Sequence, residues 1–518
     1  MSFLALPLEI HCQIISYLLS NRDVAALSIQ CRALHSVCDM AARKKYHQII
    51  IAEGESGVDT AFEFLLDILK RPELALYVRH LENNTVVTRN MDYKEAEPMR
   101  ELSAEEMTLV RKAVRMGGFL GAKEDRVVNM LMQRMDNALN QFSGYRERDV
   151  FATFVTQALA AIIIAVSPNI VSIATTNPYC RFSEIELPLD QILRQANSST
   201  ELTPYLRNLR SVYMISKTDS TWEDGRFYVA MDFYDFTRLF DHLPSIEAVS
   251  TDAMEENDIE HLNFNKKSCN ITSISIHHSS VSSIYLERLI WSRKALKEIR
   301  YSIGGRASND GGHFIFNPKS FIKAICDHKE TLEVIDIDVE DDIAAFGYDD
   351  VEDVERSLNE YGSPYEVRSD EHDSEFLKAI WENSGSLREF VSLRRLSLGV
   401  NFLLYLAKGV SGSSDKIKDR AILADCLPDS LEYLCIRGYE KGQSQDHDEQ
   451  MDGLMDFWKS GQSQLKEIQG IEETIPNASH VGAPDGDDHL LWPFDNGSDS
   501  EDEEGSDQEE SEEEQESH

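Results

Sequence analysis

Two adjacent histidines, His277 and His278, are the residues of this chain that by type are best suited to bind a metal ion. They directly follow the apolar alternation ITSISI, which predicts a β-strand. Because neighbouring residues of a strand point to opposite faces of a sheet, we expect that the two rings cannot chelate one ion. The sequence therefore predicts no metal site here.

Catalytic and cofactor-binding motifs are equally scarce. The chain has no H-E-x-x-H, G-x-S-x-G, P-loop, G-x-G-x-x-G or zinc-type Cys/His spacing. Its eight cysteines include no C-x-x-C, and several lie in apolar runs, which is typical of buried thiols in an intracellular protein, cytoplasmic or nuclear. We therefore expect a binding protein that is not an enzyme and that needs no cofactor.

The first element that must serve such binding is a helix in LPLEIHCQIISYLL. Pro7 suits the first turn of a helix. Successive residues then step about 100° around the helix axis, which places the apolar residues in two stripes on nearly opposite sides. A helix that is apolar on two faces must be buried on both. One stripe contains Leu8, Cys12, Ile15 and Leu19, and the other contains Ile10, Ile14, Tyr17 and Leu18.

Two further helices are expected after this one. Ser20 to Asp23 forms an S-x-x-D capping pattern before VAALSI, and a third amphipathic segment runs through CRALHSVCDMAARKKYHQI from Cys31. Three short helices enclose a core too small to fold robustly alone. One stripe of the first helix can close this bundle, so the other needs a partner or the rest of the chain.

These residues resemble an F-box, particularly the form found in fungal proteins. The similarity covers about the first 50 residues, although the Trp that many F-boxes carry on the third helix is missing. The resemblance implies an F-box domain over residues 1–50 that docks on a Skp-type adaptor and through it on a cullin. The alternative is that the helices only cap the following domain. The matching residues are Leu6 to Ile10 (L-P-x-E-I), Ile14, Tyr17, Leu18, Asp23, Ala26, Leu27, Cys31 to Leu34 (C-R-x-L) and Tyr46, and those expected to contact the adaptor are Leu6, Pro7, Ile10, Ile14 and Leu18.

A pattern L-x-x-Φ-x-Φ, with Φ apolar, recurs through residues 51–475 and predicts strands separated by helices. Clear copies are LRSVYM, ITSISI, LKEIRY, LEVIDI, LRRLSL and LEYLCI; weaker ones are IVSIAT, IEAVST and LKEIQG. A first strand is expected within 71–82, and a helical hairpin within 101–142. FVTQALAAIIIAV predicts a buried helix, since its uninterrupted apolar run is too short to span a membrane.

The pattern resembles irregular leucine-rich repeats, such as those in the C-terminal regions of many F-box proteins. The gaps between successive copies vary from 25 to 61 residues, whereas regular repeats have 20–29, and the usual Asn after the strand is missing. The resemblance implies an α/β fold class with a leucine-rich-repeat-like solenoid as the substrate-binding domain. An ordinary α/β domain with a parallel sheet is the alternative.

In a solenoid, alternate strand residues point onto an open face that commonly binds a protein. Leu332, Leu393 and Leu431 should then point into the core, and Arg395 and Arg437 should be exposed. Tyr and Arg are favoured at binding hot spots. The residues expected to contact a substrate are therefore Tyr213, Arg300, Arg395, Tyr433 and Arg437.

Acidic residues dominate the chain, whose net charge is −40, and they are concentrated at its end. Residues 485–518 hold 16 Asp and Glu and no Lys or Arg, so the rest keeps 75 acidic and 51 basic residues. This balance argues against nucleic-acid and membrane partners. Residues 476–518 are expected to be a disordered acidic tail, in which HLLWPF is an apolar island. Ser498, Ser500, Ser506 and Ser511 resemble sites of acidophilic, casein-type kinases.

Together, the two resemblances imply a substrate-recognition subunit of an SCF-type, cullin-based ubiquitin ligase complex. The alternative is a non-enzymatic scaffold or chaperone-like binder whose acidic tail engages basic proteins. The identity of the protein substrate cannot be read from such a repeat face.

Overall fold

A computed structural model of the chain gives the fold. It describes residues 6–16, 18, 21–52, 55–87, 93–95, 97–135, 145–179, 185–198, 203–217, 227–257, 266–304, 306, 308, 316, 318–339, 387–408, 422–461 and 463–478. The acidic segment before Leu387 and the acidic tail beyond Ala478 lie outside these residues. The described chain divides into two compact units, one ending at Lys45 and the other beginning at Tyr46.

The first unit is a small bundle of helices: α1 (Leu8–Ser16), α2 (Asn21–Ser28), α3 (Arg32–Cys38) and the start of α4 (Met40–Tyr46). The expected third helix is interrupted, because Asp39 takes a left-handed conformation (φ 45°) that ends α3 and lets α4 start in a new direction. The expectation of one continuous helix from Cys31 was therefore wrong at Asp39.

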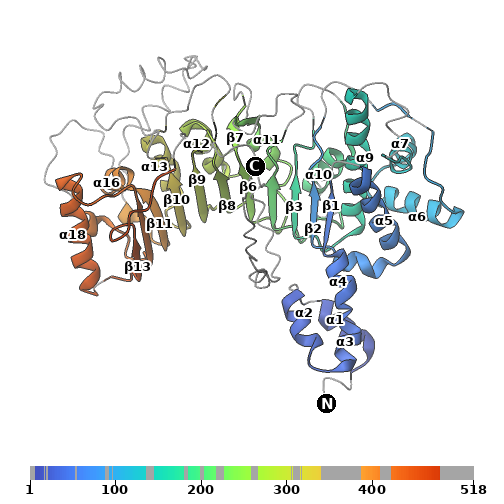
Figure 1. The fold of residues 1–518 in the computed structure, drawn as a ribbon, viewed down its shortest axis with the longest axis horizontal. Coiled ribbons are helices and arrows are strands. Elements are labelled where there is room, and N and C mark those ends of the chain that lie inside the picture. Colours follow the sequence, from blue (N-terminus) through green and yellow to red (C-terminus); the bar gives the residue numbers. More distant parts are fainter. Residues whose placement is uncertain are drawn as a thin grey trace, which may run out of the picture. The chain divides into compact units, whose positions relative to one another are not determined.

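The second unit is built on one parallel sheet of eleven strands, whose order in space follows their order in the chain (Figure 1). A short parallel pair, β5 (Val229–Met231) and β7 (Met254–Glu256), forms a separate sheet. The main strands are β1 (Gln48–Ile51), β2 (His80–Asn83), β3 (Ser172–Thr175), β4 (Ser211–Met214), β6 (Ala248–Asp252), β8 (Ser273–His277), β9 (Glu298–Ser302), β10 (Val334–Asp338), β11 (Arg395–Gly399), β12 (Tyr433–Arg437) and β13 (Glu467–Gln469).

All nine copies of the L-x-x-Φ-x-Φ pattern became strands of this sheet, from β3 to β13. The segment 71–82 contributes β2, but it is the second strand, because Gln48–Ile51 already forms β1. The sequence interpretation had assigned part of this QIII segment to the third helix. Leu332, Leu393 and Leu431, the expected core residues before three strands, are all buried.

One ladder of aliphatic side chains crosses the whole sheet and explains its register. Each member is directly opposite its neighbours on the adjacent strands, so a slip of one residue would move apolar side chains to the other face. All but the last are at most 1% exposed. The ladder comprises Ile49, Leu81, Ile173, Val212, Val249, Ile274, Ile299, Ile335, Leu396, Leu434 and Ile468.

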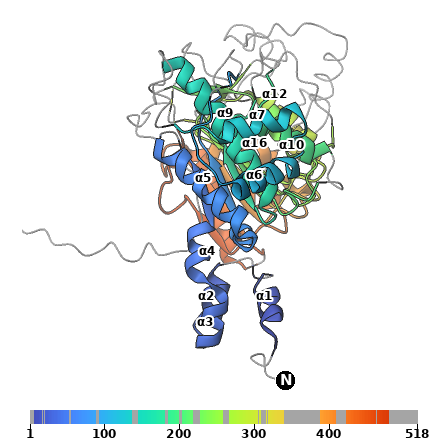
Figure 2. The same cartoon turned by 90° about the vertical axis from the view of Figure 1, so that its right-hand side faces the viewer.

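Helices connect the strands and cover the face that carries this ladder. Successive helices pack side by side, from α12 to α13, α16, α17 and α18, as expected when same-handed crossovers join strands added in order. Nearer the N-terminus, α6 and α7 form the expected hairpin (Figure 2). Both helices pack against α9, and α6 also contacts α5. The helices are α5 (Glu55–Lys70), α6 (Ala104–Met116), α7 (Ala122–Leu131), α9 (Tyr145–Val166), α10 (Pro188–Ser198), α11 (Phe233–Thr237), α12 (Ser283–Ser292), α13 (Pro318–Cys326), α16 (Val400–Lys408), α17 (Leu423–Cys426) and α18 (Gln445–Lys459), with 3-10 turns at Pro72–Tyr77 and Leu387–Glu389.

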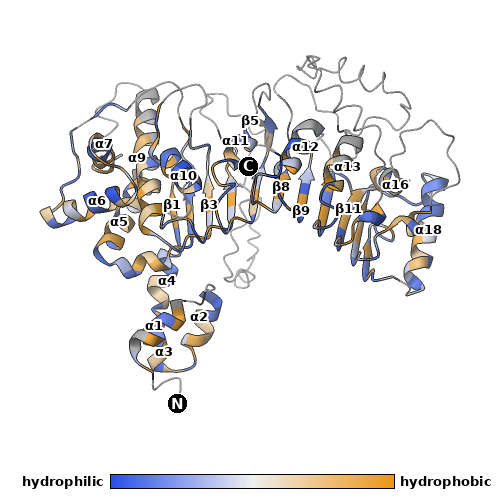
Figure 3. Ribbon diagram, turned by 180° about the vertical axis from the view of Figure 1, so that it is seen from behind, coloured by the Kyte–Doolittle hydropathy of each residue, from blue (hydrophilic) through white to orange (hydrophobic). Residues whose placement is uncertain are grey.

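Hydrophobic residues gather in the strands and in α9, whereas α18 carries mainly hydrophilic ones (Figure 3). Residues Ala158 to Ile164 of α9 are fully buried, which accounts for their continuous apolar run. In the part of the chain that the structure describes, no helix has the length and apolarity to cross a bilayer.

Several strands end in the same left-handed turn, which repeats along the sheet. Residues with positive φ directly follow β6, β8, β12 and β13, namely Ala253 (55°), His278 (44°), Gly438 (67°) and Gly470 (87°). At Gly470 a β-carbon would lie 1.7 Å from the Ile436 carbonyl oxygen, so only glycine fits there. The strand-and-helix repeats that end in these turns therefore share a backbone conformation despite their unequal lengths.

Candidate protein-binding surfaces

The packing of the N-terminal core shows which residues of α1 point inward. Ile15, Val24 and Cys38 form this core and are at most 1% exposed. Leu18 and Leu27 pack against it as partly buried neighbours. Ile15 therefore faces inward, and Leu18, expected to contact the adaptor, packs against the core instead.

The start of α1 presents apolar surface outward. Pro7 is exposed and Ile10 is 39% exposed, whereas Leu6 and Ile14 are half-buried. The Pro7 carbonyl accepts the N–H groups of Ile10 and His11, which fixes the first turn. An exposed isoleucine on a rigid helix can contribute to protein binding because covering it removes apolar surface from water.

Ile29, just after α2, is 78% exposed and was not singled out in the sequence. The apolar pattern of VAALSI suggested burial along that segment, but α2 ends at Ser28 and Ile29 lies in the turn beyond it. The N-terminal unit thus exposes a second isoleucine besides Ile10.

The second candidate surface is the face of the sheet opposite the aliphatic ladder, called here the open face. Two rows of residues flank the ladder and point to this side. On the later strands most members of these rows are charged or polar side chains. The first row includes Ser273, Glu298, Val334, Arg395, Tyr433 and Glu467, and the second includes Ser275, Arg300, Asp336, Ser397, Cys435 and Gln469.

Arg395 and Tyr433 make a stacked pair on the open face. The guanidinium carbon of Arg395 lies 4.4 Å from the centre of the Tyr433 ring. The Tyr433 hydroxyl donates a hydrogen bond of 2.9 Å to Gln469, which holds the ring in place. Among the described residues, no carboxylate lies within ion-pair distance of the exposed Arg395. The pair therefore offers a flat, positioned cation without a counter-charge.

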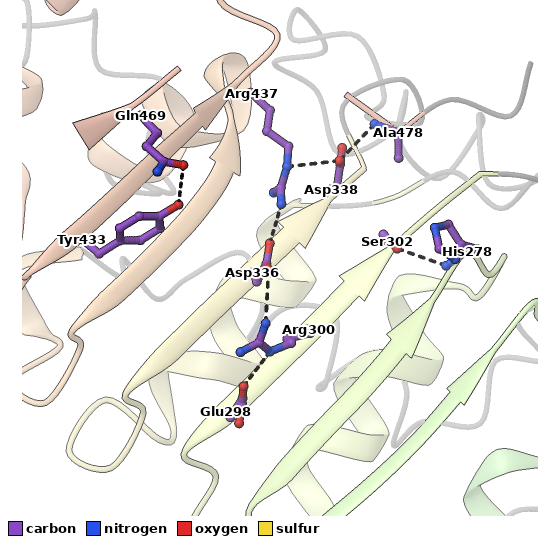
Figure 4. A network of polar contacts seen from close by, with 10 residues as sticks. All are labelled: His278, Glu298, Arg300, Ser302, Asp336, Asp338, Tyr433, Arg437, Gln469 and Ala478. Carbon is purple, nitrogen blue, oxygen red and sulfur yellow. Dashed lines mark hydrogen bonds and ion pairs between the residues drawn. The ribbon is translucent and has the colours of Figure 1, made fainter. Parts of the chain in front are cut away.

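The other two arginines of the open face are bound to carboxylates (Figure 4). Arg300 donates to Glu298 at 2.6 Å and lies 3.8 Å from Asp336. Arg437 donates to the other oxygen of Asp336 at 2.9 Å and lies 3.3 Å from Asp338. Asp336 thus links two arginines from strands β9 and β12, and their charge is largely balanced.

Two of the five expected substrate contacts are less accessible than predicted. Tyr213 occupies the second row but is 2% exposed, and burial raises its pKa well above the usual value. The side chain of Arg437 is 18% exposed, because it lies between Asp336 and Asp338. The expectation that Arg437 is exposed was wrong. Of the five, Arg395, Tyr433 and Arg300 remain open to a partner.

The two adjacent histidines lie in different surroundings, His277 more buried than His278. His277 and His278 have ring centres 6.3 Å apart, and no group of metal-binding side chains occurs among the described residues. The Nδ1 of His278 lies 3.1 Å from Asp252, and this hydrogen bond raises the pKa of His278. His80, further along the sheet, has its pKa lowered to about 4 by burial.

The chain after β13 returns across the ends of earlier strands, in a segment called here the C-terminal strap (Thr474–Ala478). The carbonyl of Ile475 accepts the Gly438 N–H at 2.8 Å, and Ala478 donates its N–H to Asp338 at 3.0 Å (Figure 4). The strap thus leads from β12 back to β10. Nothing in the local sequence signalled it, since its partner Asp338 lies 140 residues earlier.

No known protein family matches the chain, and no curated protein matches it closely enough to count as a relative. The fold by itself therefore defines an α/β protein with a large parallel sheet and interleaved helices. Any more particular assignment rests on the two surfaces.

Proposed function

We propose that the chain is the substrate-recognition subunit of an SCF-type, cullin-based ubiquitin ligase. Its N-terminal helices would dock on a Skp-type adaptor, and the open face of the sheet would bind the protein substrate. The observation that carries this proposal is the orientation of α1. Ile15 lies in the core, while Pro7 and Ile10 of the F-box-like L-P-x-E-I motif are exposed.

The architecture of the second unit supports the substrate-binding role. Eleven parallel strands in chain order, helices on one face and a repeated left-handed turn support a leucine-rich-repeat-like solenoid. On the later strands, from β8 to β13, the second face carries mainly half-buried or exposed side chains. The polar side chains there, with Arg395 exposed and Tyr433 half-buried, suit recognition of another protein.

The role requires no chemistry from this chain. A recognition subunit accelerates ubiquitin transfer by holding a substrate close to a ubiquitin-conjugating enzyme, which raises its effective concentration. The N-terminal helices would bind the adaptor, and the open face would bind the substrate.

Co-purification with the adaptor tests the proposal. The tagged full-length chain should retain a co-expressed Skp-type adaptor in stoichiometric amount. Ile10→Asp should abolish this, because a carboxylate would be buried without a partner in the apolar contact. Ile50→Asp is the matched control, since Ile50 is 42% exposed but belongs to β1 of the second unit. Equal adaptor recovery from both variants, or none from the native chain, would refute the assignment.

A further inference from the structure

A fully buried arginine lies beside a buried cysteine in the second unit. Arg293, the residue directly after α12, is 0% exposed, and Cys269, before β8, is 2% exposed. An isolated parallel bridge joins their backbones, and Nη1 of Arg293 donates a hydrogen bond to Sγ of Cys269. The two side chains therefore form a polar pair in the interior of the protein.

The charge of Arg293 has no carboxylate as a direct partner. A guanidinium group keeps its proton throughout the ordinary pH range, so the positive charge stays in the interior. Among the residues that the structure describes, no carboxylate lies within ion-pair distance of Arg293, and its Nε and Nη2 have no hydrogen-bond partner. A buried charge without a counter-charge is costly. Cys269 is thus the ionisable group in direct contact with this cation.

Two opposing effects act on the thiol of Cys269. Burial raises its pKa, whereas the positive charge of Arg293 lowers this pKa by favouring the thiolate. Asp241 also raises the pKa of Cys269, but the carboxylate of Asp241 accepts a hydrogen bond of 2.8 Å from Asn197. Arg293 therefore stabilises the thiolate of Cys269 at a position where burial alone would suppress it.

Cys326, at the end of α13, offers a comparison within the same unit. It is half-buried, and burial and the carboxylate of Glu389 raise its thiol pKa to about 11. Lys329, the cation near it, is already bound to Glu389 at 2.8 Å. Exposure alone would make Cys326 the more reactive of the two thiols, whereas the neighbouring charge favours Cys269.

The two remaining donors of Arg293 indicate what the pair can accept. Nη1 is bonded to the sulfur, so the N–H groups of Nε and Nη2 are left for a further acceptor beside Sγ. An oxygen atom bonded to the sulfur is such an acceptor, and as an anion it gains charge-assisted hydrogen bonds. The pair therefore suits a cysteine that carries one added oxygen.

We propose that Cys269 is a peroxide-sensitive modification site, whose thiolate and sulfenate forms are both stabilised by Arg293. The thiolate sulfur attacks one oxygen of hydrogen peroxide, so that an S–O bond forms and the O–O bond breaks. The sulfur is oxidised by two electrons and the peroxide is reduced. The leaving hydroxide takes up the proton that the thiol released, which gives a sulfenic acid and water. Ionisation of this acid places the sulfenate against the guanidinium.

Peroxide can reach this site although Cys269 is buried. Cys269 lies two residues after the exposed Lys267, in a short segment outside the main strands. A local opening of such a segment is enough for a molecule about as small as two waters. Larger reagents are excluded by the same burial. The inference does not depend on the proposed ligase role.

Peroxide treatment of the full-length chain tests the site. The sulfenic acid is trapped with a diketone probe, and mass spectrometry quantifies the labelled cysteines. Cys269 should be labelled about tenfold faster than the more exposed Cys326, or more. Arg293→Gln should remove this advantage, and Arg293→Lys, which keeps the charge, should restore part of it. Lys294→Gln is the matched control, because it removes one exposed positive charge from the next residue.

Each outcome supports or overturns the proposal. Equal labelling of Cys269 and Cys326 in the native chain would overturn it, and this comparison needs no variant to fold. Faster labelling of Cys269 in Arg293→Gln would show that burial alone protects the thiol, and an equal loss in Lys294→Gln would show that any nearby charge suffices; both would also overturn it. Melting temperatures of the variants identify a loss of structure.

Discussion

The guanidinium of Arg395 stacks on the ring of Tyr433, with 4.4 Å between guanidinium carbon and ring centre, and the two residues are direct neighbours on β11 and β12. The stack limits the orientations of a long side chain before any partner arrives. The Arg395 side chain therefore loses less conformational entropy when a partner binds than an unsupported arginine would. This pair is the element of the open face that we expect to matter most for recognition.

Substitutions at Leu393 and Arg395, two positions apart, should have very different effects on stability. Leu393 is fully buried before β11, whereas Arg395 is exposed. Leu393→Ala should lower the free energy of unfolding by about 2–5 kcal/mol through lost burial and a cavity. Arg395→Ala should change it by less than about 0.5 kcal/mol. Urea melts of the two variants check the order, and a larger loss for Arg395 would mean that the assigned faces are exchanged.

Arg437 should behave as a structural residue although it lies on the same face. It separates Asp336 from Asp338, and Arg437→Gln would leave these two carboxylates without their shared cation. We expect a loss of about 1–3 kcal/mol in the free energy of unfolding. Arg437→Lys keeps the charge but cannot reproduce the paired geometry, so it should recover only part of the loss. Equal stability of Arg437→Gln and Arg395→Gln would contradict the linked network.

His278 and His80 should titrate far apart, and of these two only His278 should depend on Asp252. The hydrogen bond to Asp252 raises the folded-state pKa of His278 above 6.5. Its stabilisation is therefore complete below pH 6.5 and is lost as the pH rises through the folded pKa. Asp252→Asn should lower the pKa of His278, as followed by NMR of the ring protons. His80, with a pKa of about 4, is the internal control. A His278 pKa that stays the same in this variant would show that the pairing is absent in solution.

The sheet was largely predictable because its signal is local. Each L-x-x-Φ-x-Φ copy carries its own alternation, so all nine were found without knowing their partners. β1 was missed because QIII follows Arg43, Lys44 and Lys45 without a break, and a four-residue apolar run does not distinguish a strand from a helix end.

The site was less predictable because it depends on register between distant segments. Asp336 joins Arg300 to Arg437 only because β9 and β10 pair at the observed positions and β11 separates β10 from β12 by one strand. The repeat gaps range from 25 to 61 residues, so this register cannot be read from spacing. The same holds for the strap, whose bond to Asp338 has no local pattern.

The affinity of the full-length chain for a Skp-type adaptor is the most direct measure of the proposed role. Isothermal titration should give a Kd that rises about tenfold or more for the Pro7→Ala/Ile10→Ala variant, since an exposed apolar contact worth about 1.4 kcal/mol or more is removed. Ile50→Ala, a change of similar exposure in the second unit, should leave the Kd as it is. An unchanged Kd in the double variant, with the same melting temperature as the native chain, would contradict the assignment of α1 as the adaptor-binding helix.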